Sequence, residues 1–543
     1  MVALAFIGLV ATSCGNQNSE TGQPTATVSQ KNDNVNESTE TATAGGRLVY
    51  GLIAETNGWN PSASQWATSG TQVARTIYDT LAAYDENSQI QPFLAEKFTP
   101  NATYDEWVIT LRPNVKFHNG KTLTADDVRR NQEFLKRSPL TSSPYETIES
   151  FSTRGELDVV VKMKDPWVNY PYSLATQIGV VVDPDWMEDK ASDPQKPIGT
   201  GPFKVDTWVP DKSMLVRKNA SYWQKGYPLL DEVEYRPIPD DTSRSNSLRS
   251  GELDVIEASN SQEIKKFKGD ADTGDFQVFN AVQGESAEVF VMINTLQPPL
   301  DTIEGRQALA YATDADYYNA TLNGGLFEVA KGPFSPSSPW YTATDYPSPD
   351  ANKARDLVEK VKTNNGGQFK IALVGPPTPG VQEGMQLLEQ QWEAVGIDVE
   401  ISTTDQLSMI VKVISGKYQA AIWQQFDSPN PLGDSVWWHP RSAFPLDSDK
   451  TSLNFARSKD DEIGKALDLA RQTTDPAVEK EQYRIVQQRM NANLPYIWLY
   501  HAQVAVVADK TLVNVTKFNL PNGTRGLGVQ SGVHPVWQIW RKA

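Results

Sequence analysis

The sequence predicts an α/β fold that is divided into two or three lobes. In the second half of the chain, helical segments at 351–361 and 385–395 alternate with apolar strands at 369–374 and 397–401, an order typical of α/β architecture. The chain has 543 residues, which is too long for one hydrophobic core. Hydrophobic residues make up 39% of the sequence, so there is enough apolar material for several cores.

In the first part of the chain, short apolar segments predict strands, and one segment predicts a helix. The folded body is expected to begin with a strand at 47–53, followed by a helix at 73–81. Further strands are predicted at 158–163 and 178–182. These elements flank the most informative stretch of the sequence.

That stretch, residues 94–135, predicts a strand, a tight turn, a short second strand and a helix. Trp107, Ile109 and Leu111 fall on one side of the strand predicted at 107–112, which is the two-residue period of a half-buried strand. One face of this strand is therefore expected to enter a core.

The turn is predicted at Asn119-Gly120. This pair supplies the positive φ angles of a two-residue hairpin between short strands at 115–118 and 121–123. The helix that follows is predicted to begin after Thr124, whose hydroxyl can cap it.

The predicted cap has two carboxylates close to it. Asp127, three residues after Thr124, completes the pattern of a capping box, and Asp126 adds a second negative charge in the first turn. Both carboxylates are thus explained by helix capping, and neither is assigned a catalytic role.

Later segments carry further local signals. Gly199 and Gly201 permit backbone geometry that other residues resist, and Gly251 is expected at the end of a helix, ahead of a strand. A strand at 291–294 precedes a helix that contains Arg306.

The amino-acid sequence of residues 94–135 closely resembles that of the extracellular solute-binding proteins of the dipeptide, oligopeptide and nickel class. These proteins deliver ligands to ABC importers. Matches to this family run in order from about residue 48 to about residue 505. They include the segments 197–205, 219–223, 229–237, 248–255, 291–294, 298–301 and 493–500.

The resemblance implies a two-lobed periplasmic-binding-protein-like fold of the class II type, hinged around a buried ligand cleft, with an extra subdomain inserted in the first lobe. The expected boundaries are 46–75, 190–285 and 500–543 for the first lobe, 76–189 for the inserted subdomain and 286–499 for the second lobe.

Residues 1–14 are predicted to be a signal peptide. The apolar run Met1–Val10 is far shorter than the roughly 20 residues needed to span a bilayer. The small residues before Cys14 resemble a bacterial lipobox, in which the cysteine is lipidated. Ala11 stands where Leu is usual, and no basic residue precedes the apolar run, which favours a start upstream of Met1. A cleaved secretory peptide with an incidental cysteine is the alternative.

Residues 15–45 are predicted to form a disordered tether. They consist largely of Ser, Thr, Asn, Gln and Gly, with almost no apolar side chain. Under the lipoprotein interpretation, such a tether would hold the folded body away from the membrane surface.

The richest candidate for ligand recognition is the strand end that carries Trp423, Gln424, Gln425, Phe426 and Asp427. A Trp ring can cover a ligand at modest entropic cost, and Gln amides can pair with the main chain of a peptide. Asp427 can neutralise a buried α-amino group, an interaction that is strong in a closed cleft with little water.

The resemblance both supports and complicates a role for Asp427. In peptide-binding family members, the Asp that holds the ligand's amino terminus comes three residues after the Trp. Here Phe426 stands at that position. Either the loop shifts by one residue and Asp427 serves, or the amine site is absent. An ordinary surface turn is a further interpretation of Asp427.

On the other side of the cleft, family members use the loop after the first strand. That loop runs here from Trp59 to Gly70, so Trp66 and Thr68 are candidates, although Trp66 can equally pack against the hinge. Trp437 and Trp438 fit a core better than a binding wall.

Other classes of protein find little support. The excess of 17 negative charges argues against a nucleic-acid partner. The four histidines are scattered, and no zinc, nucleophile-elbow or phosphate-loop motif occurs. A glycoside hydrolase is not excluded by motif, because two carboxylates from any part of the chain could suffice. We expect no enzyme, no cofactor and no metal held by protein ligands; a metal would enter only within a chelate.

The sequence and the resemblance together predict a solute-binding lipoprotein, anchored through Cys14 to the outer face of the cytoplasmic membrane or located in the periplasm. The protein is expected to be a monomer. It would capture short peptides by lobe closure and deliver them to the permease and ATPase subunits of an ABC importer. Two alternatives remain: the same fold binding an oligosaccharide or another polar solute, and a peptide-sensing surface receptor that is not coupled to import.

Overall fold

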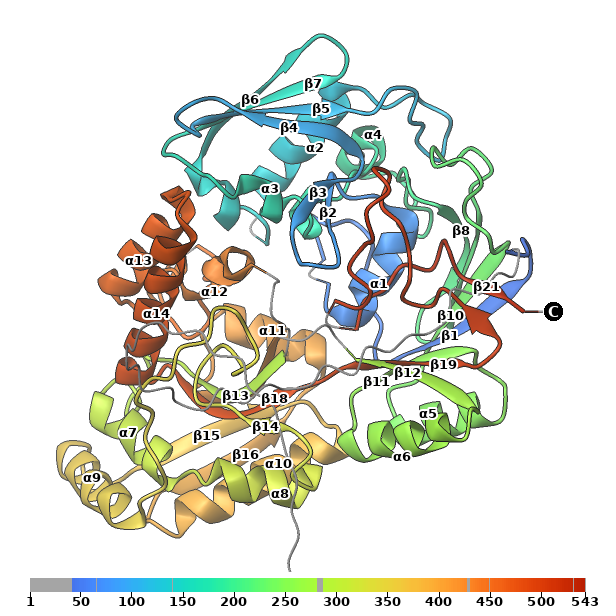
Figure 1. Ribbon diagram of the computed structural model, residues 1–543. Helices are drawn as coiled ribbons and strands as arrows, with labels where there is room; N and C mark the ends of the chain where they lie inside the picture. Colours follow the sequence, from blue (N-terminus) through green and yellow to red (C-terminus); the bar gives the residue numbers. More distant parts are fainter. Residues whose placement is uncertain are drawn as a thin grey trace, which may run out of the picture. The chain divides into compact units, whose positions relative to one another are not determined.

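The computed structural model describes residues 42–542 except 65, 139, 281–286, 427–429, 449 and 531. The described residues belong to one compact unit. Their strands form two large sheets of seven and six strands, a four-stranded sheet and two small two-stranded sheets (Figure 1). The predicted α/β class is confirmed.

The seven-stranded sheet has the order β12-β19-β11-β1-β10-β9-β8. The apolar strand predicted at 47–53 is β1, and it pairs in parallel with β10 on one side and β11 on the other. The strands are β1 (Arg47–Leu52), β8 (Phe203–Val209), β9 (Ser213–Lys218), β10 (Glu232–Pro237), β11 (Val255–Ala258), β12 (Phe276–Asn280) and β19 (Ala505–Asp509). The helices that lie next to the seven-stranded sheet are α1 (Thr68–Ile77), α5 (Asp241–Arg249) and α6 (Ser261–Asp272).

The six-stranded sheet has the order β14-β18-β13-β17-β15-β16. Its strands are β13 (Ala287–Ile293), β14 (Glu328–Val329), β15 (Lys370–Gly375), β16 (Asp398–Thr403), β17 (Ala420–Phe426) and β18 (Tyr496–Ala502). One face packs against α7 (Ile303–Ala312), α8 (Ala315–Asn323), α9 (Ala351–Asn364) and α10 (Pro379–Glu393). The other face packs against α11 (Gln406–Ile414), α13 (Asp461–Gln472) and α14 (Pro476–Asn493).

The four-stranded sheet, with order β4-β5-β7-β6, holds the predicted half-buried strand. Trp107, Ile109 and Leu111 in β5 are buried and alternate with half-buried neighbours, which confirms the two-residue period. The elements here are β4 (Ala95–Pro100), β5 (Glu106–Leu111), β6 (Ile148–Arg154), β7 (Asp158–Met163), α2 (Ala125–Arg137), η1 (Ser143–Thr147) and α3 (Tyr170–Ser173). We call residues 93–181 the insert module, because they contain this sheet and its helices.

The remaining elements are short. They are β2 (Ala82–Tyr84), β3 (Ile90–Pro92), η2 (Gln177–Gly179), α4 (Pro184–Glu188), η3 (Pro431–Asp434), α12 (Ser435–Trp438), η4 (Pro440–Ser442), β20 (Leu512–Val513) and β21 (Trp540–Arg541). No helix among the described residues combines the length and the apolar character that a bilayer crossing requires.

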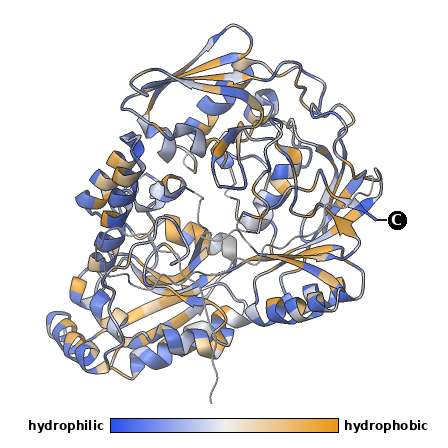
Figure 2. Cartoon of the chain, in the orientation of Figure 1, coloured by the Kyte–Doolittle hydropathy of each residue, from blue (hydrophilic) through white to orange (hydrophobic). Residues whose placement is uncertain are grey.

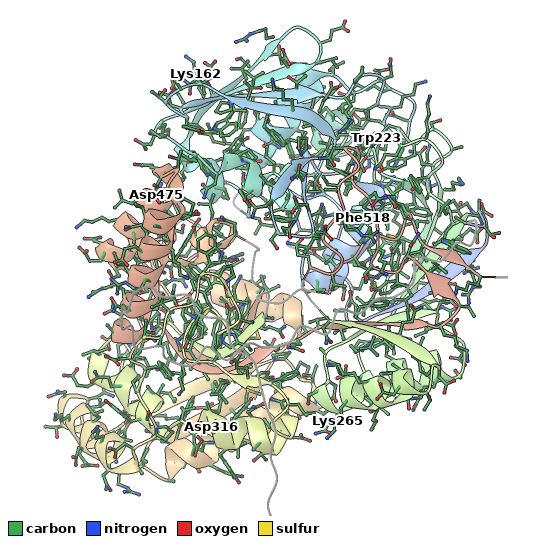
Figure 3. All side chains as sticks on the ribbon, viewed as in Figure 1. Lys162, Trp223, Lys265, Asp316, Asp475 and Phe518 are labelled. Carbon is green, nitrogen blue, oxygen red and sulfur yellow. The ribbon has the colours of Figure 1, made fainter. Side chains whose placement is uncertain are left out.

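The strands of both large sheets are predominantly hydrophobic, and the outer helices carry hydrophilic residues along one side (Figure 2). Many of the helices begin at polar caps, although α1 and α10 have no side-chain cap. Asp475, for example, precedes α14 and accepts a hydrogen bond from the backbone N–H of Ala477 (Figure 3). This distribution is what burial of apolar surface requires of helices that cover a sheet.

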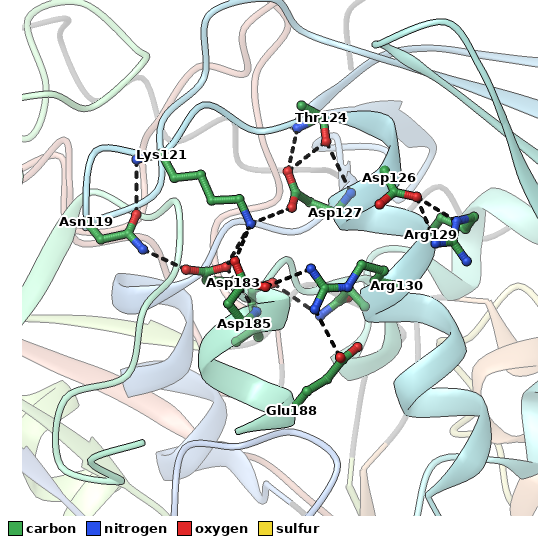
Figure 4. Close-up of polar contacts among 12 residues, drawn as sticks. Asn119, Lys121, Thr124, Asp126, Asp127, Arg129, Arg130, Asp183, Asp185 and Glu188 are labelled. Carbon is green, nitrogen blue, oxygen red and sulfur yellow. Dashed lines mark hydrogen bonds and ion pairs between the residues drawn. The ribbon is translucent and has the colours of Figure 1, made fainter. Parts of the chain in front are cut away.

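The start of α2 confirms the predicted capping box. The Thr124 hydroxyl accepts from the N–H of Asp127, and the Asp127 carboxylate accepts from the N–H of Thr124. Asp127 also pairs with Lys121, whose Nζ lies 2.7 Å from Oδ1 (Figure 4). The same ammonium lies 3.4 Å from Asp183 and 2.8 Å from Asp185, so it joins the insert module to α4.

The turn before α2 differs from the prediction. The N–H of Phe117 bonds to the carbonyl of Lys121, which leaves three residues in the loop, and Gly120 takes the positive φ of 90°. A three-residue loop with a left-handed glycine is the next most common hairpin connection. Asn119 does not take a positive φ; its side chain donates to Asp183.

Two other predictions were wrong, the first in the bounds of a helix and the second in expecting a strand. The helix predicted at 73–81 is α1, Thr68–Ile77, because residues after Tyr78 are extended. The strand predicted at 178–182 reduces to the isolated bridges Thr80–Val180 and Val182–Gly199.

Gly199 and Gly201 are required for close approach rather than for an unusual φ. A Cβ atom on Gly199 would lie 2.3 Å from the carbonyl oxygen of Ile77, and one on Gly201 would lie 2.5 Å from the same atom. The chain at these glycines therefore packs directly on the end of α1.

Candidate ligand-binding site

The chain leaves the seven-stranded sheet where β12 ends at Asn280, and it returns to that sheet through residues 503–504, between β18 and β19. Asn280 at the end of β12 pairs with Ala505 of β19, and Ala287 at the start of β13 pairs with Ala502 of β18. The strand ends on either side of this passage are therefore neighbours in each sheet. We call residues 503–504, together with the strand ends Asn280 and Ala287 that flank them, the hinge.

Both sheets direct the carboxyl ends of their parallel strands toward the hinge. In the seven-stranded sheet, β11 ends at Ala258, which pairs with Ala505. In the six-stranded sheet, β17 ends at Phe426, which pairs with Ala287. Open α/β sheets bind ligands beyond the carboxyl ends of their strands, so the candidate site lies at these two edges.

The last residues of β17 form the wall on the six-stranded sheet. Trp423, Gln424 and Gln425 are half-buried, and the Trp423 ring meets Phe455 edge-on with centroids 5.5 Å apart. Because neighbouring strand residues alternate, Trp423 and Gln425 share one face of the sheet, and Gln424 lies on the other. Phe426 is the last residue of the strand.

Asp427, the residue on which the amine-site prediction depends, lies outside the described residues, as does Cys14. The prediction that Asp427 holds an amino group is therefore untested.

A row of polar side chains crosses the six-stranded sheet beside Gln425. Glu288 of β13 is opposite Gln425 on one side and His501 of β18 on the other. Glu288 is 1% exposed and His501 is 3% exposed. Burial lowers the pKa of His501 to about 4, so its ring is neutral near pH 7. In the sequence, the signal for this row is a single carboxylate, Glu288, within the otherwise apolar strand Ala287–Ile293, and it was not predicted as a site residue.

On the seven-stranded sheet, the two predicted residues have different surroundings. Trp66 is 7% exposed, stacks on Tyr78 with centroids 5.9 Å apart, and donates from Nε1 to the carbonyl of Gly58. Its side chain therefore packs within the core of this sheet. Thr68 begins α1 beside the hinge, because a Cβ on Gly532 would touch both Thr68 and Val504.

A buried carboxylate is hydrogen-bonded to the loop after β1. Glu257 of β11 is 0% exposed and accepts from the N–H of Ile53 at 3.1 Å and from the Ser69 hydroxyl at 2.5 Å. Burial raises the pKa of Glu257 to about 7. This carboxylate links the end of β1 to the start of α1 at the edge that faces the hinge.

We expect this burial to make stability depend on pH. The folded pKa of Glu257 lies above the ordinary value of about 4.5, so the folded state binds the proton more tightly, and stability falls as pH rises from about 4.5 to about 7. In Glu257→Gln this slope should be absent, so the variant should gain melting temperature relative to wild type across that range. Parallel pH profiles for the two proteins would contradict the assignment, and Glu96→Gln, at an exposed position, is the control.

A hollow of about 630 Å³, open to solvent, lies between the insert module and the six-stranded half of the molecule. The two parts meet beside it: the N–H of Val168 donates to the carbonyl of Arg471 at 2.9 Å, and Asn169 donates to Glu479 at 3.2 Å. Leu432, five residues after Asp427 in the chain, packs into the core of the insert module.

The remaining histidines and the paired tryptophans have structural surroundings. His118 contacts the carbonyl of Gly201, and His534 contacts the carbonyl of Val515 and the hydroxyl of Tyr50. Trp438 is buried against Phe334, which agrees with the prediction that this tryptophan belongs to a core. Within the described residues, no group of three or more His, Cys, Asp or Glu is arranged to hold a metal ion.

The chain is similar to known solute-binding proteins over most of its length. The family model described as bacterial extracellular solute-binding proteins, family 5 middle, matches residues 89–443. The glutathione-binding protein GsiB of Pectobacterium atrosepticum is 24% identical over 463 residues, which cover 81% of this chain and 86% of that protein.

Solved structures agree with this. AgaA from A. tumefaciens R10, in complex with agropinic acid, is 25% identical with a TM-score of 0.79, over 92% of this chain and 99% of AgaA. The oligopeptide-binding protein AppA of Bacillus subtilis, in complex with a nonapeptide, is 22% identical with a TM-score of 0.78, over 93% of this chain and all of AppA.

These similarities confirm the two-lobed periplasmic-binding-protein-like fold, and they confirm the prediction of a solute-binding protein rather than an enzyme. The domain boundaries given by the sequence stay a prediction. The chain belongs to the bacterial extracellular solute-binding proteins of family 5.

Proposed function

We propose that the protein captures short peptides at the hinge-facing edges of its two large sheets and delivers them to the permease of an ABC importer. The observation that carries the proposal is the end of β17, where half-buried Trp423 and Gln425 share one face at the hinge. The ring offers apolar cover, and the amide offers a donor and an acceptor to a peptide main chain.

The relatives support peptides as the ligand class. One relative is named for glutathione, a tripeptide, and two structural neighbours hold a nonapeptide and the peptide STSA. In such a protein, open and closed forms interconvert, and ligand contacts with both lobes favour the closed form.

We also propose that the mature protein is anchored by a lipid on Cys14 and tethered by residues 15–45 on the outer face of the cytoplasmic membrane. The small residues before Cys14 and the polar composition of 15–45 support this placement. A surface receptor that senses peptides without import would need the same body.

A second candidate is a polar solute other than a peptide. The neighbour AgaA holds agropinic acid, and Phe426 rather than an acidic residue comes three positions after Trp423. Both observations fit a ligand that lacks a free amino terminus.

The deciding experiment identifies the ligand directly. Residues 46–543 are purified under native conditions and denatured, and the released small molecules are identified by mass spectrometry. Release of short peptides would support the leading proposal and give their length. Released sugars or another polar solute would replace it with the second candidate, while the fold assignment would stand.

Asp427 is tested by Asp427→Asn. If Asp427 pairs with a buried ammonium, the variant should bind a released peptide about tenfold more weakly or worse, because a charge-assisted hydrogen bond contributes about 1.5–3 kcal/mol. Isothermal titration calorimetry measures the affinity. Asp398→Asn, at the far end of β16, is the control, and unchanged affinity in Asp427→Asn would remove the amine site from this loop.

A further inference from the structure

The hollow between the insert module and the six-stranded half has a charged wall. Arg471 donates from Nη2 to Asp468 at 3.2 Å, and Arg441 is hydrogen-bonded to the same carboxylate oxygen. His439 lies 3.5 Å from the other oxygen of Asp468. All four residues line the hollow.

This wall carries more positive than negative charge. Burial lowers the pKa of His439, so its ring is neutral near pH 7. Two guanidinium groups then share the single carboxylate of Asp468. Asp165, on the insert module, also acts on Arg471, but it is exposed and its charge is screened by solvent. The hollow is therefore suited to an anion.

Arg471 has unused donors. It is 5% exposed, and its Nε and Nη1 have no hydrogen-bond partner among the described residues. Its guanidinium lies over the Trp167 ring at 5.7 Å. A buried donor without a partner costs about 1–3 kcal/mol, so a carboxylate that accepts from this group would remove a penalty.

The arrangement of the parts explains how a ligand would reach these donors. Trp167, which lies against Arg471, belongs to the insert module, and the Val168–Arg471 hydrogen bond joins the two parts. The proposed lobe opening would part this junction and expose Arg471. A ligand bound at Arg471 would be enclosed when they close again.

The rest of the hollow mixes apolar side chains with the hydroxyls of Thr147, Ser173, Thr176, Ser435 and Ser442, and part of it follows the candidate site in the chain. Ile178, Leu432 and Leu467 line it beside the charged wall. Leu432 and Val436 come within ten residues of the end of β17. An apolar side chain next to a carboxylate would fit these surroundings.

We infer that this hollow binds the carboxylate end and the adjoining apolar side chain of an extended ligand whose other end lies at β17. The inference rests on the proposed function, because a peptide with a free carboxyl terminus is the ligand class that joins these features. Arg441 and Arg471 would then determine preference for a free acid at that end.

The test compares short peptides with their carboxyl-terminal amides. Tri- to hexapeptides of alanine ending in leucine, as free acids and as amides, are titrated into the wild-type protein and into Arg441→Gln. The wild type should bind at least one free acid tenfold or more tightly than its amide. In Arg441→Gln that ratio should fall to about one, mainly through weaker binding of the acid.

Arg441→Gln is preferred to a change of Arg471 because the Arg441 side chain is 29% exposed and its loss is tolerable for folding. Arg484→Gln is the matched control, since Arg484 pairs with Glu481 on α14 and is not part of the hollow. Its ratio of acid to amide affinity should equal that of the wild type.

Three results would overturn the inference. Equal wild-type affinity for acids and amides would exclude a carboxylate site while leaving peptide capture intact. An equal loss of the ratio in Arg484→Gln would show that the effect is not local to the hollow. Failure of the wild type to bind any peptide in either form would overturn the proposed function together with the inference.

Discussion

Replacing Lys121 with methionine should destabilise the protein by about 3–5 kcal/mol. The ammonium of Lys121 is the shared partner of Asp127 and Asp183, whose side chains are 5% and 2% exposed. Lys121 itself is 33% exposed, but removing it would leave two buried carboxylates with only neutral hydrogen-bond donors, such as Thr124 and Asn119, in place of their cation. The free energy of unfolding, measured by urea titration with circular dichroism, should show the loss.

Arg129→Met is the control for this prediction. Arg129 lies on the same helix and also bonds two carboxylates, Asp126 and Glu133, but all three side chains are partly exposed (Figure 4). Its loss should cost less than about 1 kcal/mol. Equal losses in the free energy of unfolding for the two substitutions would mean that the burial of Asp127 and Asp183 does not add to the cost of losing their cation.

Gly201→Ala should be the second most damaging change, with a loss of roughly 3 kcal/mol. The new Cβ would lie 2.5 Å from both the carbonyl carbon and the oxygen of Ile77, and backbone atoms cannot rotate away. Gly201 is fixed on both sides, because its N–H donates to Ile77 and its carbonyl accepts from Asn219. Forcing extra atoms into a packed site commonly costs 1–3 kcal/mol and sometimes more.

Gly269→Ala gives the opposite expectation and serves as the comparison. Gly269 lies inside α6, and a Cβ there would meet no atom within 4 Å. Alanine is the better helix former, so this variant should gain about 0.5–1 kcal/mol. Thermal melts of the two variants should therefore shift in opposite directions. A neutral Gly201→Ala would show that the chain can withdraw from α1.

Local patterns in the sequence predicted most of the regular elements. The alternation of Trp107, Ile109 and Leu111 and the cap at Thr124 depend on neighbours within a few residues, so they could be read directly. The end of α1 could not, because Tyr78 becomes extended where Gly199 and Gly201 pack on the helix end. That contact joins residues more than a hundred positions apart.

The candidate site shows the same difference between local signals, which the sequence reveals, and contacts between distant residues, which it does not. The strand end at Trp423 was visible as an aromatic and two amides after an apolar run. The pairing of Glu288 with Gln425 and His501 was not, because it depends on the register of three strands from distant parts of the chain. Nor was the meeting of Arg441 and Arg471 at Asp468, since nothing local in the sequence relates an arginine in η4 to one in α13.

The position of the hinge has a consequence for how the protein reaches its folded state. Within the part of the chain that the structure describes, β12 pairs with β19 alone, and β19 is synthesised after the whole six-stranded sheet. An emerging chain can therefore finish the six-stranded half as a continuous unit while β11 and β12 wait with open edges. Because open strand edges promote aggregation, β11 and β12 remain exposed to it until β19, at residues 505–509, has paired with both. Completion of the seven-stranded sheet is then the late step of biogenesis.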